Sequence, residues 1–158
     1  MLEKTNVMRI IEQKKLPYVS HYYGDTDAVS GVEVAAAMGE DPEKVFKTLV
    51  CTGKTGNHYV FVIPVKEELD LKKAAKAVGE KSIEMLKAKD LLGLTGYVHG
   101  GCSPIGMKKL FKTVIHQTAA DYEIIMFSAG KIGYQVELPL SGLQKVIPVQ
   151  VADIIVEG

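Results

Sequence analysis

A run of β-branched and aromatic residues places the strongest constraint on the fold of this chain. The segments TLVCT (residues 48–52) and HYVFVIPV (residues 58–65) both favour strands, and the five residues GKTGN between them form turns readily. A connection this short joins antiparallel strands, because parallel strands need a crossover of a dozen or more residues. Residues 48–65 therefore predict a β-hairpin.

Capping signals predict helices before and after the hairpin. Thr5 can cap a first helix, Ser30 and Glu33 form a Ser-x-x-Glu capping box, and Asp70 can cap a later helix that stops at Gly79. The predicted helices span residues 5–15, 30–38, 70–79 and 140–145, with a helical turn at 88–92 and a further helix opened by Asp41-Pro42.

Further strand-like segments follow at irregular intervals. They are residues 82–86, 113–118, 122–130, 133–138 and 147–154, and residues 17–23 are extended after Pro17. Several of the connections are too short for parallel crossovers. This pattern favours α/β architecture with a mixed or mostly antiparallel sheet that can close on itself, over a doubly wound fold.

The length and charge balance indicate one globular domain, residues 1–158, without a strong bias toward anionic partners. The 158 residues include 19 Lys and Arg and 19 Asp and Glu, so any nucleic-acid contact must come from local clustering. The lysines gather in three groups, Lys72, Lys73 and Lys76, then Lys81, Lys87 and Lys89, then Lys108, Lys109 and Lys112. Each group also fits a solvated helix face.

The sequence suggests a reducing, cytoplasmic location and no membrane partner. The N-terminus lacks the charged and apolar regions of a secretory signal, and no apolar run approaches the ~20 residues that cross a bilayer. Cys51 and Cys102 form no spacing motif typical of a disulfide framework.

Two glycine-bearing loops are candidates for a functional site. HGGCSPIG (residues 99–106) lacks the spacing of a phosphate-binding loop, but its glycines allow close approach to a ligand and can present amide groups to an oxyanion. FSAGKIG (residues 127–133) puts Ser128 at the end of an apolar strand and Lys131 in the turn. Both segments also fit simple connections between strands.

Metal ligation and a cysteine nucleophile are poorly supported. The four histidines are dispersed, without HExxH or CxxC motifs or carboxylates at ligand spacing. His99 lies three residues before Cys102, whereas catalytic Cys and His are usually distant in sequence. We therefore interpret Cys102 as a small residue packed in a turn.

Lys47 stands where the helix opened by Asp41-Pro42 would pass into the strand 48–52. A lysine at a helix C-terminus interacts favourably with the helix dipole. A functional cation at the start of a rigid strand is the alternative, and the local pattern leaves both open.

Taken together, VFKTLV around Lys47, the hairpin, LDLKKAAKAVG, TGYVHGGCSPIG and MFSAGKIG resemble the YbaK-type deacylases over nearly the whole chain. These proteins are freestanding relatives of the editing (INS) domain of bacterial prolyl-tRNA synthetases. The chain is most similar to the subgroup of Cys-tRNA(Pro)/Cys-tRNA(Cys) deacylases that includes EbsC. The resemblance implies a single compact domain with a highly curved, barrel-like mixed sheet surrounded by helices.

The resemblance also implies a set of site residues and no cofactor or metal. The implied catalytic residues are Lys47, Gly101, Tyr23 and Ser128, and the implied substrate-binding residues are Thr48, Gly100, Ser30, Ser103, Gly130 and Gln135. Ser30 stands where the characterised cysteine-specific enzyme has an aromatic residue, and Gln135 where it has an aspartate.

The implied reaction is removal of cysteine from tRNA(Pro) and tRNA(Cys). The substrate thiol would attack its own carbonyl, which would make the enzyme a lyase if cleavage is by cyclisation. The implied partners are the aminoacyl-tRNA 3′ end and prolyl-tRNA synthetase in a ternary complex, with no DNA. Alternatives are a deacylase for another small amino acid such as Ala-tRNA(Pro), a non-catalytic nucleotide-binding regulatory module, and a lysine Schiff-base enzyme.

Overall fold

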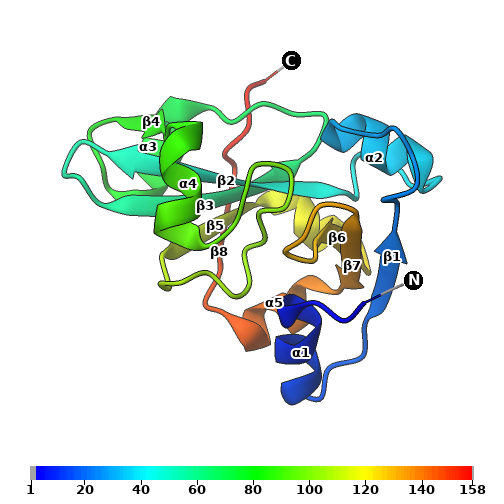
Figure 1. Cartoon of the computed structure of the whole chain (residues 1–158). Coiled ribbons are helices and arrows are strands. Elements are labelled where there is room, and N and C mark those ends of the chain that lie inside the picture. The colour runs from blue at the N-terminus through cyan, green and yellow to red at the C-terminus, as the bar shows by residue number, and fades with distance from the viewer. Residues whose placement is uncertain (1–2, 158) are drawn as a thin grey trace.

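The computed structural model describes residues 3–157, which fold into helices packed around two sheets (Figure 1). The helices are α1 (Asn6–Gln13), α2 (Gly31–Ala37), α3 (Leu71–Val78), α4 (Ala88–Thr95) and α5 (Leu140–Val146), with a 3-10 turn η1 (Gln117–Asp121). The strands are β1 (Val19–Tyr22), β2 (Phe46–Gly53), β3 (His58–Pro64), β4 (Ile83–Met85), β5 (Lys112–His116), β6 (Ile125–Ser128), β7 (Tyr134–Leu138) and β8 (Gln150–Ala152). None of these helices has the length and apolar character needed to cross a membrane.

The mixed α/β fold expected from the sequence is confirmed, but the strands form two sheets and not one closed barrel. The larger sheet has the order β4-β2-β3-β5-β8; its β2 runs antiparallel to β3 and β4, whereas β5 is parallel to β3 and β8. The smaller sheet, β1-β7-β6, is antiparallel throughout. The isolated bridge between Val45 and Met126 joins the sheets just before β2 begins.

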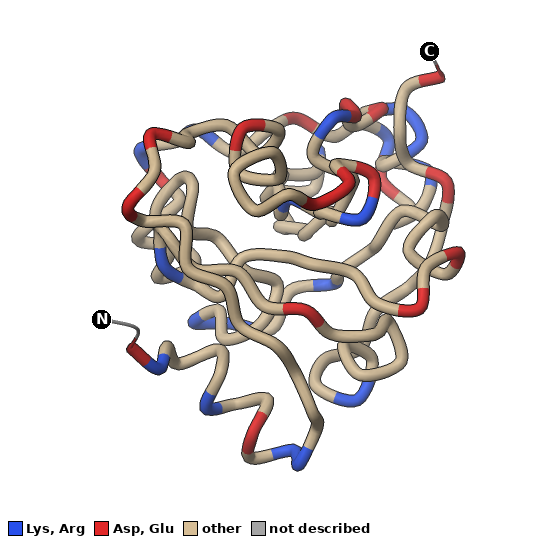
Figure 2. Tube along the Cα trace, turned by 90° about the vertical axis from the view of Figure 1, so that its right-hand side faces the viewer, with Lys and Arg blue, Asp and Glu red and all other residues tan. Residues whose placement is uncertain are grey.

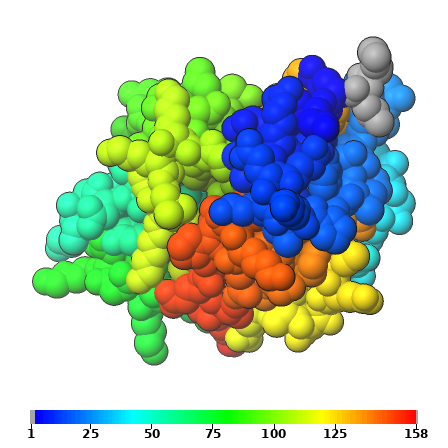
Figure 3. Space-filling view, turned by 90° about the horizontal axis from the view of Figure 1, so that it is seen from below, coloured from blue at the N-terminus to red at the C-terminus, as the bar shows by residue number. Residues whose placement is uncertain are grey.

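The larger sheet has a separate apolar core on each face because β2 and β3 alternate buried side chains to both sides. On one face, Phe61 and Ile63 pack with Ala74 and Ala75 of α3. The other face packs against the smaller sheet, α1 and α5, with Leu143 of α5 in the core. Figure 3 shows α1 (blue) lying against α5 (orange) on the lower side of the molecule.

The predicted caps form as expected. The Thr5 hydroxyl accepts a hydrogen bond from the Met8 N–H at 3.3 Å, and Asp70 accepts from the first turn of α3. Ser30 and Glu33 make both bonds of the capping box. Helix α4 is longer than the predicted turn at 88–92 and continues to Thr95.

The prediction of a helix that starts at Asp41-Pro42 is wrong, because the residues that follow join the two sheets. The Lys44 N–H closes one turn onto the Asp41 carbonyl at 3.0 Å, but the Lys44 carbonyl accepts from the Met126 N–H at 2.9 Å. The Val45 carbonyl likewise accepts from Val65, so the sheets use the groups that a helix would need. Lys47 is consequently the second residue of β2 and meets no helix dipole.

Candidate active site

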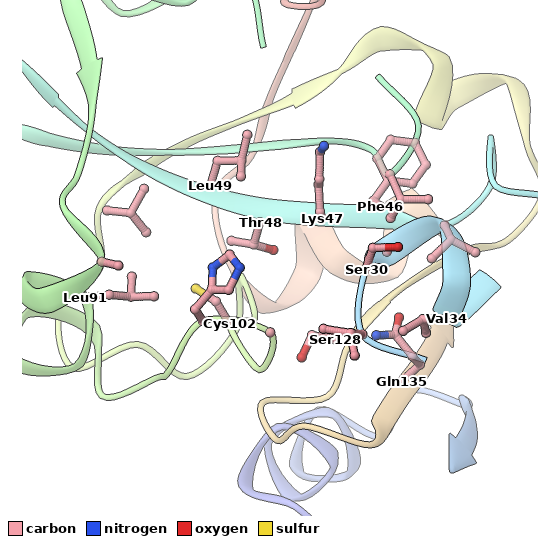
Figure 4. A pocket seen from close by; sticks show the side chains of 18 of the residues that line it. Ser30, Val34, Phe46, Lys47, Thr48, Leu49, Leu91, Cys102, Ser128 and Gln135 are labelled. Atoms are coloured by element: carbon pink, nitrogen blue, oxygen red, sulfur yellow. The ribbon is translucent and has the colours of Figure 1, made fainter. Parts of the chain in front are cut away.

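A cavity of about 360 Å³ opens between α2, α4, β2 and the loop at residues 99–102 (Figure 4). This volume lies within the range usual for small-molecule sites. Seven of the ten predicted site residues line the cavity: Tyr23, Ser30, Lys47, Thr48, Gly100, Ser128 and Gln135. The other three, Gly101, Ser103 and Gly130, are not part of the lining.

The middle of β2 passes this cavity as an unpaired edge. Backbone groups of successive residues in a strand point alternately to its two sides. The Val45 carbonyl bonds toward β3, whereas the Val50 carbonyl accepts from the Leu86 N–H at 3.0 Å on the β4 side. The even-numbered residues of β2 therefore turn their backbone groups away from β3. Strand β6 reaches this edge only near Val45, and β4 pairs only from Cys51 onward. Within residues 3–157, the N–H and C=O of Thr48 therefore have no strand beside them and face the gap.

Lys47 and Thr48 project from opposite sides of β2, as the pleat requires (Figure 4). Thr48 points toward Cys102, whereas Lys47 rises on the far side of the strand. Partial burial lowers the pKa of the Lys47 ammonium, and the carboxylates of Glu68 and Glu67 oppose this shift. Lys47 is therefore a partly desolvated cation in the cavity lining, on the opposite side of β2 from Cys102.

Two buried oxygens in the cavity wall have no hydrogen-bond partner within the described residues. They are Thr48 Oγ1 and Gln135 Oε1, and the Gln135 side chain is only 7% exposed. Gln135 lies opposite Ser128 in the β6–β7 ladder, and Figure 4 shows both near Ser30 and Val34 of the α2 region. Leaving a buried acceptor unpaired costs about 1–3 kcal/mol, so this wall is suited to a ligand that donates hydrogen bonds.

The glycine loop shapes the cavity, but only part of it is available to a ligand. Gly100 has a φ of 88°, a left-handed conformation that favours glycine. The Gly101 N–H donates to the Val98 carbonyl at 3.0 Å, so this amide is already occupied. A side chain on Gly101 would lie 3.0 Å from the Ile132 backbone nitrogen, which explains the small residue there. The Gly101 N–H is therefore not available to bind an oxyanion, and any such contact must come from another backbone amide of the loop.

The remaining predicted residues support the lining from behind. The Gly130 N–H donates to Ser128 Oγ at 3.1 Å and fixes that hydroxyl at the end of β6. Ser103 is fully buried, and its hydroxyl accepts from the Ile105 N–H at 3.3 Å. Ser30 is both a cavity residue and the N-cap of α2, so its hydroxyl couples the cavity to that helix.

The lining residues that the structure describes include no activated protein nucleophile. Burial raises the pKa of the Cys102 thiol to about 12, so the thiol stays protonated near neutral pH. No hydrogen bond in residues 3–157 joins Ser128 to a histidine or carboxylate that could activate it. Among residues 3–157, no Asp or Glu lines the cavity and Lys47 is its one lysine, so the site favours an anionic or neutral ligand.

Sequence reasoning did not single out several lining residues. The apolar wall includes Val34 of α2, Leu49 of β2 and Leu91 of α4, which are ordinary hydrophobic positions in the sequence. His99, which sequence reasoning weighed only as an activator of Cys102, also lines the cavity.

A possible metal-binding group lies outside the cavity lining. His21, Glu40 and Glu137 each offer a ligand atom, and these atoms all lie within 4.8 Å of one another. His21 Nε2 is 2.7 Å from Glu137 Oε2, and Lys44 Nζ lies 3.9 Å from Glu40 as a competing cation. The sequence separations hide this arrangement.

Comparisons with known proteins converge on tRNA editing. The family described as the aminoacyl-tRNA editing domain matches residues 26–146. A candidate Cys-tRNA(Pro)/Cys-tRNA(Cys) deacylase of Enterococcus faecalis, EbsC, is 46% identical over 96% of this chain and 93% of its own length. A proline–tRNA ligase of Pelobacter propionicus is 30% identical over 52% of this chain, which is 14% of the ligase. A solved candidate trans-editing enzyme for prolyl-tRNA synthetase superposes with a TM-score of 0.81 at 26% identity, covering 96% of this chain and 95% of that one.

Proposed function

We propose that this chain, which belongs to the aminoacyl-tRNA editing domain family, is a deacylase. It removes cysteine wrongly attached to tRNA(Pro) and also acts on Cys-tRNA(Cys). The observation that carries the proposal is the cavity at the unpaired edge of β2. In the described part of the chain, its lining combines one lysine, no carboxylate and two buried acceptors without partners. Such a site suits the 3′ end of a tRNA, which brings phosphate oxygens, ribose hydroxyls and an amino group.

Each cavity residue then has a defined task. The Lys47 ammonium binds the phosphate or a ribose oxygen of the terminal adenosine and orients the ester. Gln135 Oε1 and Thr48 Oγ1 accept hydrogen bonds from the donors that the aminoacyl-adenosine offers. Tyr23 and Ser128 close the wall around the amino acid, and the apolar residues Val34 and Leu91 limit its size.

The chemistry requires little from the protein, because an aminoacyl ester is already activated. The sulfur of the substrate cysteine attacks its own carbonyl carbon, and the ester C–O bond breaks. The thiol proton ends on the departing ribose oxygen, and the product is a cyclic thioester. No activated serine or cysteine lines the cavity within residues 3–157, and this supports the route.

A deacylation assay with Cys-, Ala-, Ser- and Pro-tRNA(Pro) tests the proposal. We expect rapid release of cysteine and slow release of serine, since serine has the same shape but a far poorer nucleophile. Preferential release of alanine would assign the enzyme to another small amino acid, which the differences at Ser30 and Gln135 make a specific alternative. Nucleotide binding without release of any amino acid would instead favour the regulatory module.

A lysine Schiff-base mechanism has a direct test. Borohydride added during turnover would trap an amine adduct on Lys47 if an imine forms. We expect no adduct, because the ammonium lies across β2 from Cys102 (Figure 4).

The partner is the second part of the proposal. We infer that prolyl-tRNA synthetase forms a ternary complex with this protein and tRNA in the cytoplasm, and the relatedness to a proline–tRNA ligase supports this. If the isolated protein strongly discriminated Cys-tRNA(Pro) from Cys-tRNA(Cys), a synthetase would not be needed to supply tRNA identity, and this inference would fail.

A further inference from the structure

The structure separates the lysine groups of the sequence into different electrostatic settings. On α3, Lys73 Nζ contacts Asp153 at 3.0 Å and Glu157 at 3.6 Å, so acids of the C-terminal segment neutralise one of the three lysines of this helix. Figure 2 shows a comparable mixture of acidic and basic residues along one side of the molecule. The lysines around α4 differ from this pattern.

Four exposed lysines lie at the two ends of α4, and we call them the α4 surface: Lys87, Lys89, Lys108 and Lys109. Lys87 is the N-cap residue of α4, and Lys89 lies in the first turn. Lys108 is held at the other end, where its N–H donates to the Thr95 carbonyl at 3.0 Å and its Nζ to the Gly93 carbonyl at 3.3 Å. None of the four forms a salt bridge with another residue in the range 3–157.

Helix stability does not explain the two lysines at the start of α4. Cations near a helix N-terminus meet the positive end of the helix dipole, which is unfavourable. Lys87 also makes no side-chain capping bond. A binding role accounts for basic residues at this end better than a structural one.

The α4 surface is continuous with the cavity. Ala88 and Leu91 of the same helix line the cavity, as does His99 in the loop that follows. Residues 91–120 contain no Asp or Glu at all, and Asp90 is the one acid of α4. A polyanion that reaches the cavity along α4 therefore meets lysines with little opposing charge.

We propose that the α4 surface binds backbone phosphates of the tRNA acceptor end whose terminal adenosine enters the cavity, an inference that rests on the proposed function. The eight residues of α4 span about 12 Å, so the lysines at its two ends can contact separate phosphates of one strand. Phosphate contacts position a nucleic acid without reading its sequence, which suits an end shared by all tRNAs.

Three variants test the surface: K87Q/K89Q, K108Q/K109Q and the quadruple combination. The matched control is K72Q/K76Q, which removes two exposed lysines from α3. For each, kcat/KM is measured with Cys-tRNA(Pro) and with 3′-cysteinyl-adenosine, which lacks the acceptor stem. Direct binding of uncharged tRNA is titrated between 50 and 200 mM salt.

We expect the quadruple variant to lose about 10-fold or more in kcat/KM on the tRNA at 50 mM salt and to keep wild-type rates on cysteinyl-adenosine. The slope of its log affinity against log salt should be less steep than that of the wild type by roughly 3. Four lysines are removed, and each phosphate contact contributes about 0.7–0.9 to the steepness. Equal losses in the control, equal losses on both substrates, or an unchanged salt slope would overturn the inference. So would a loss that appears only with prolyl-tRNA synthetase present, which would assign the surface to that protein.

Binding of uncharged tRNA also keeps this inference distinct from the proposed function. If the wild type released no amino acid from any substrate, the proposed function would fail. The salt slopes of the four variants would still decide whether the α4 surface contacts RNA.

Discussion

Replacing Lys47 with methionine removes the ammonium from the cavity while keeping a long apolar side chain. Lys47 forms no salt bridge within residues 3–157, so the change orphans no paired carboxylate. Burial already lowers the pKa of this group, which means that the folded protein disfavours its charge. We therefore expect the melting temperature of K47M to equal or exceed that of the wild type.

Activity should respond differently from stability. A hydrogen bond to a charged group contributes about 1.5–3 kcal/mol, which corresponds to a loss of about 10- to 150-fold in kcat/KM on Cys-tRNA(Pro). Because Lys47 is expected to hold the tRNA end throughout the reaction, the loss should appear mainly in KM.

The assay is deacylation of Cys-tRNA(Pro) at several substrate concentrations, together with thermal unfolding. Lys54→Met is the control, since Lys54 follows β2 at the hairpin end and does not line the cavity. Wild-type kcat/KM in K47M, or an equal loss in K54M, would refute the role assigned to this residue.

Three further predictions follow from the same structure. Cys102→Ala should keep deacylation within a few-fold of the wild type, because a thiol with a pKa of about 12 is no nucleophile at neutral pH; complete inactivation would restore the protein-nucleophile mechanism. Ser30→Ala should cost about 1 kcal/mol and lower the melting temperature by about 2–4 °C, since both bonds of the α2 capping box involve this residue; no shift would contradict the capping role. Burial lowers the pKa of His116, whose Nδ1 accepts from the Ile154 N–H at 3.2 Å, so the unfolded chain takes up its proton first as the pH falls. The free energy of unfolding in urea should then decrease below pH ~6.5, and His116→Gln should weaken this dependence; an equal decrease in the variant would exclude His116 as its source.

Local signals predicted most of the secondary structure because the groups that define it lie within a few residues. The capping box at Ser30, the cap at Asp70 and the hairpin at residues 48–65 all form as expected. The signal at Asp41-Pro42 failed because Met126, more than eighty residues away, uses the Lys44 carbonyl. Tertiary contacts of this kind leave no trace in the local pattern.

The site could be predicted only in part. The ordered motifs led to seven residues that line the cavity, since family resemblance carries information about distant contacts. Neither composition nor spacing could indicate that the Gly101 N–H is bound to Val98, or that His21 lies beside Glu40 and Glu137. The first is a turn within the glycine loop, and the second depends on the pairing of β1 with β7 and on Glu40 lying beside those strands.

The unpaired edge of β2 has a consequence for how this protein tolerates mutation. The Thr48 N–H and C=O belong to the main chain, so any residue except proline at this position would still present both groups to the gap. Side-chain scanning would therefore underestimate what β2 contributes to recognition. A single substitution other than to proline would leave these backbone groups in the cavity, because the path of β2 positions them.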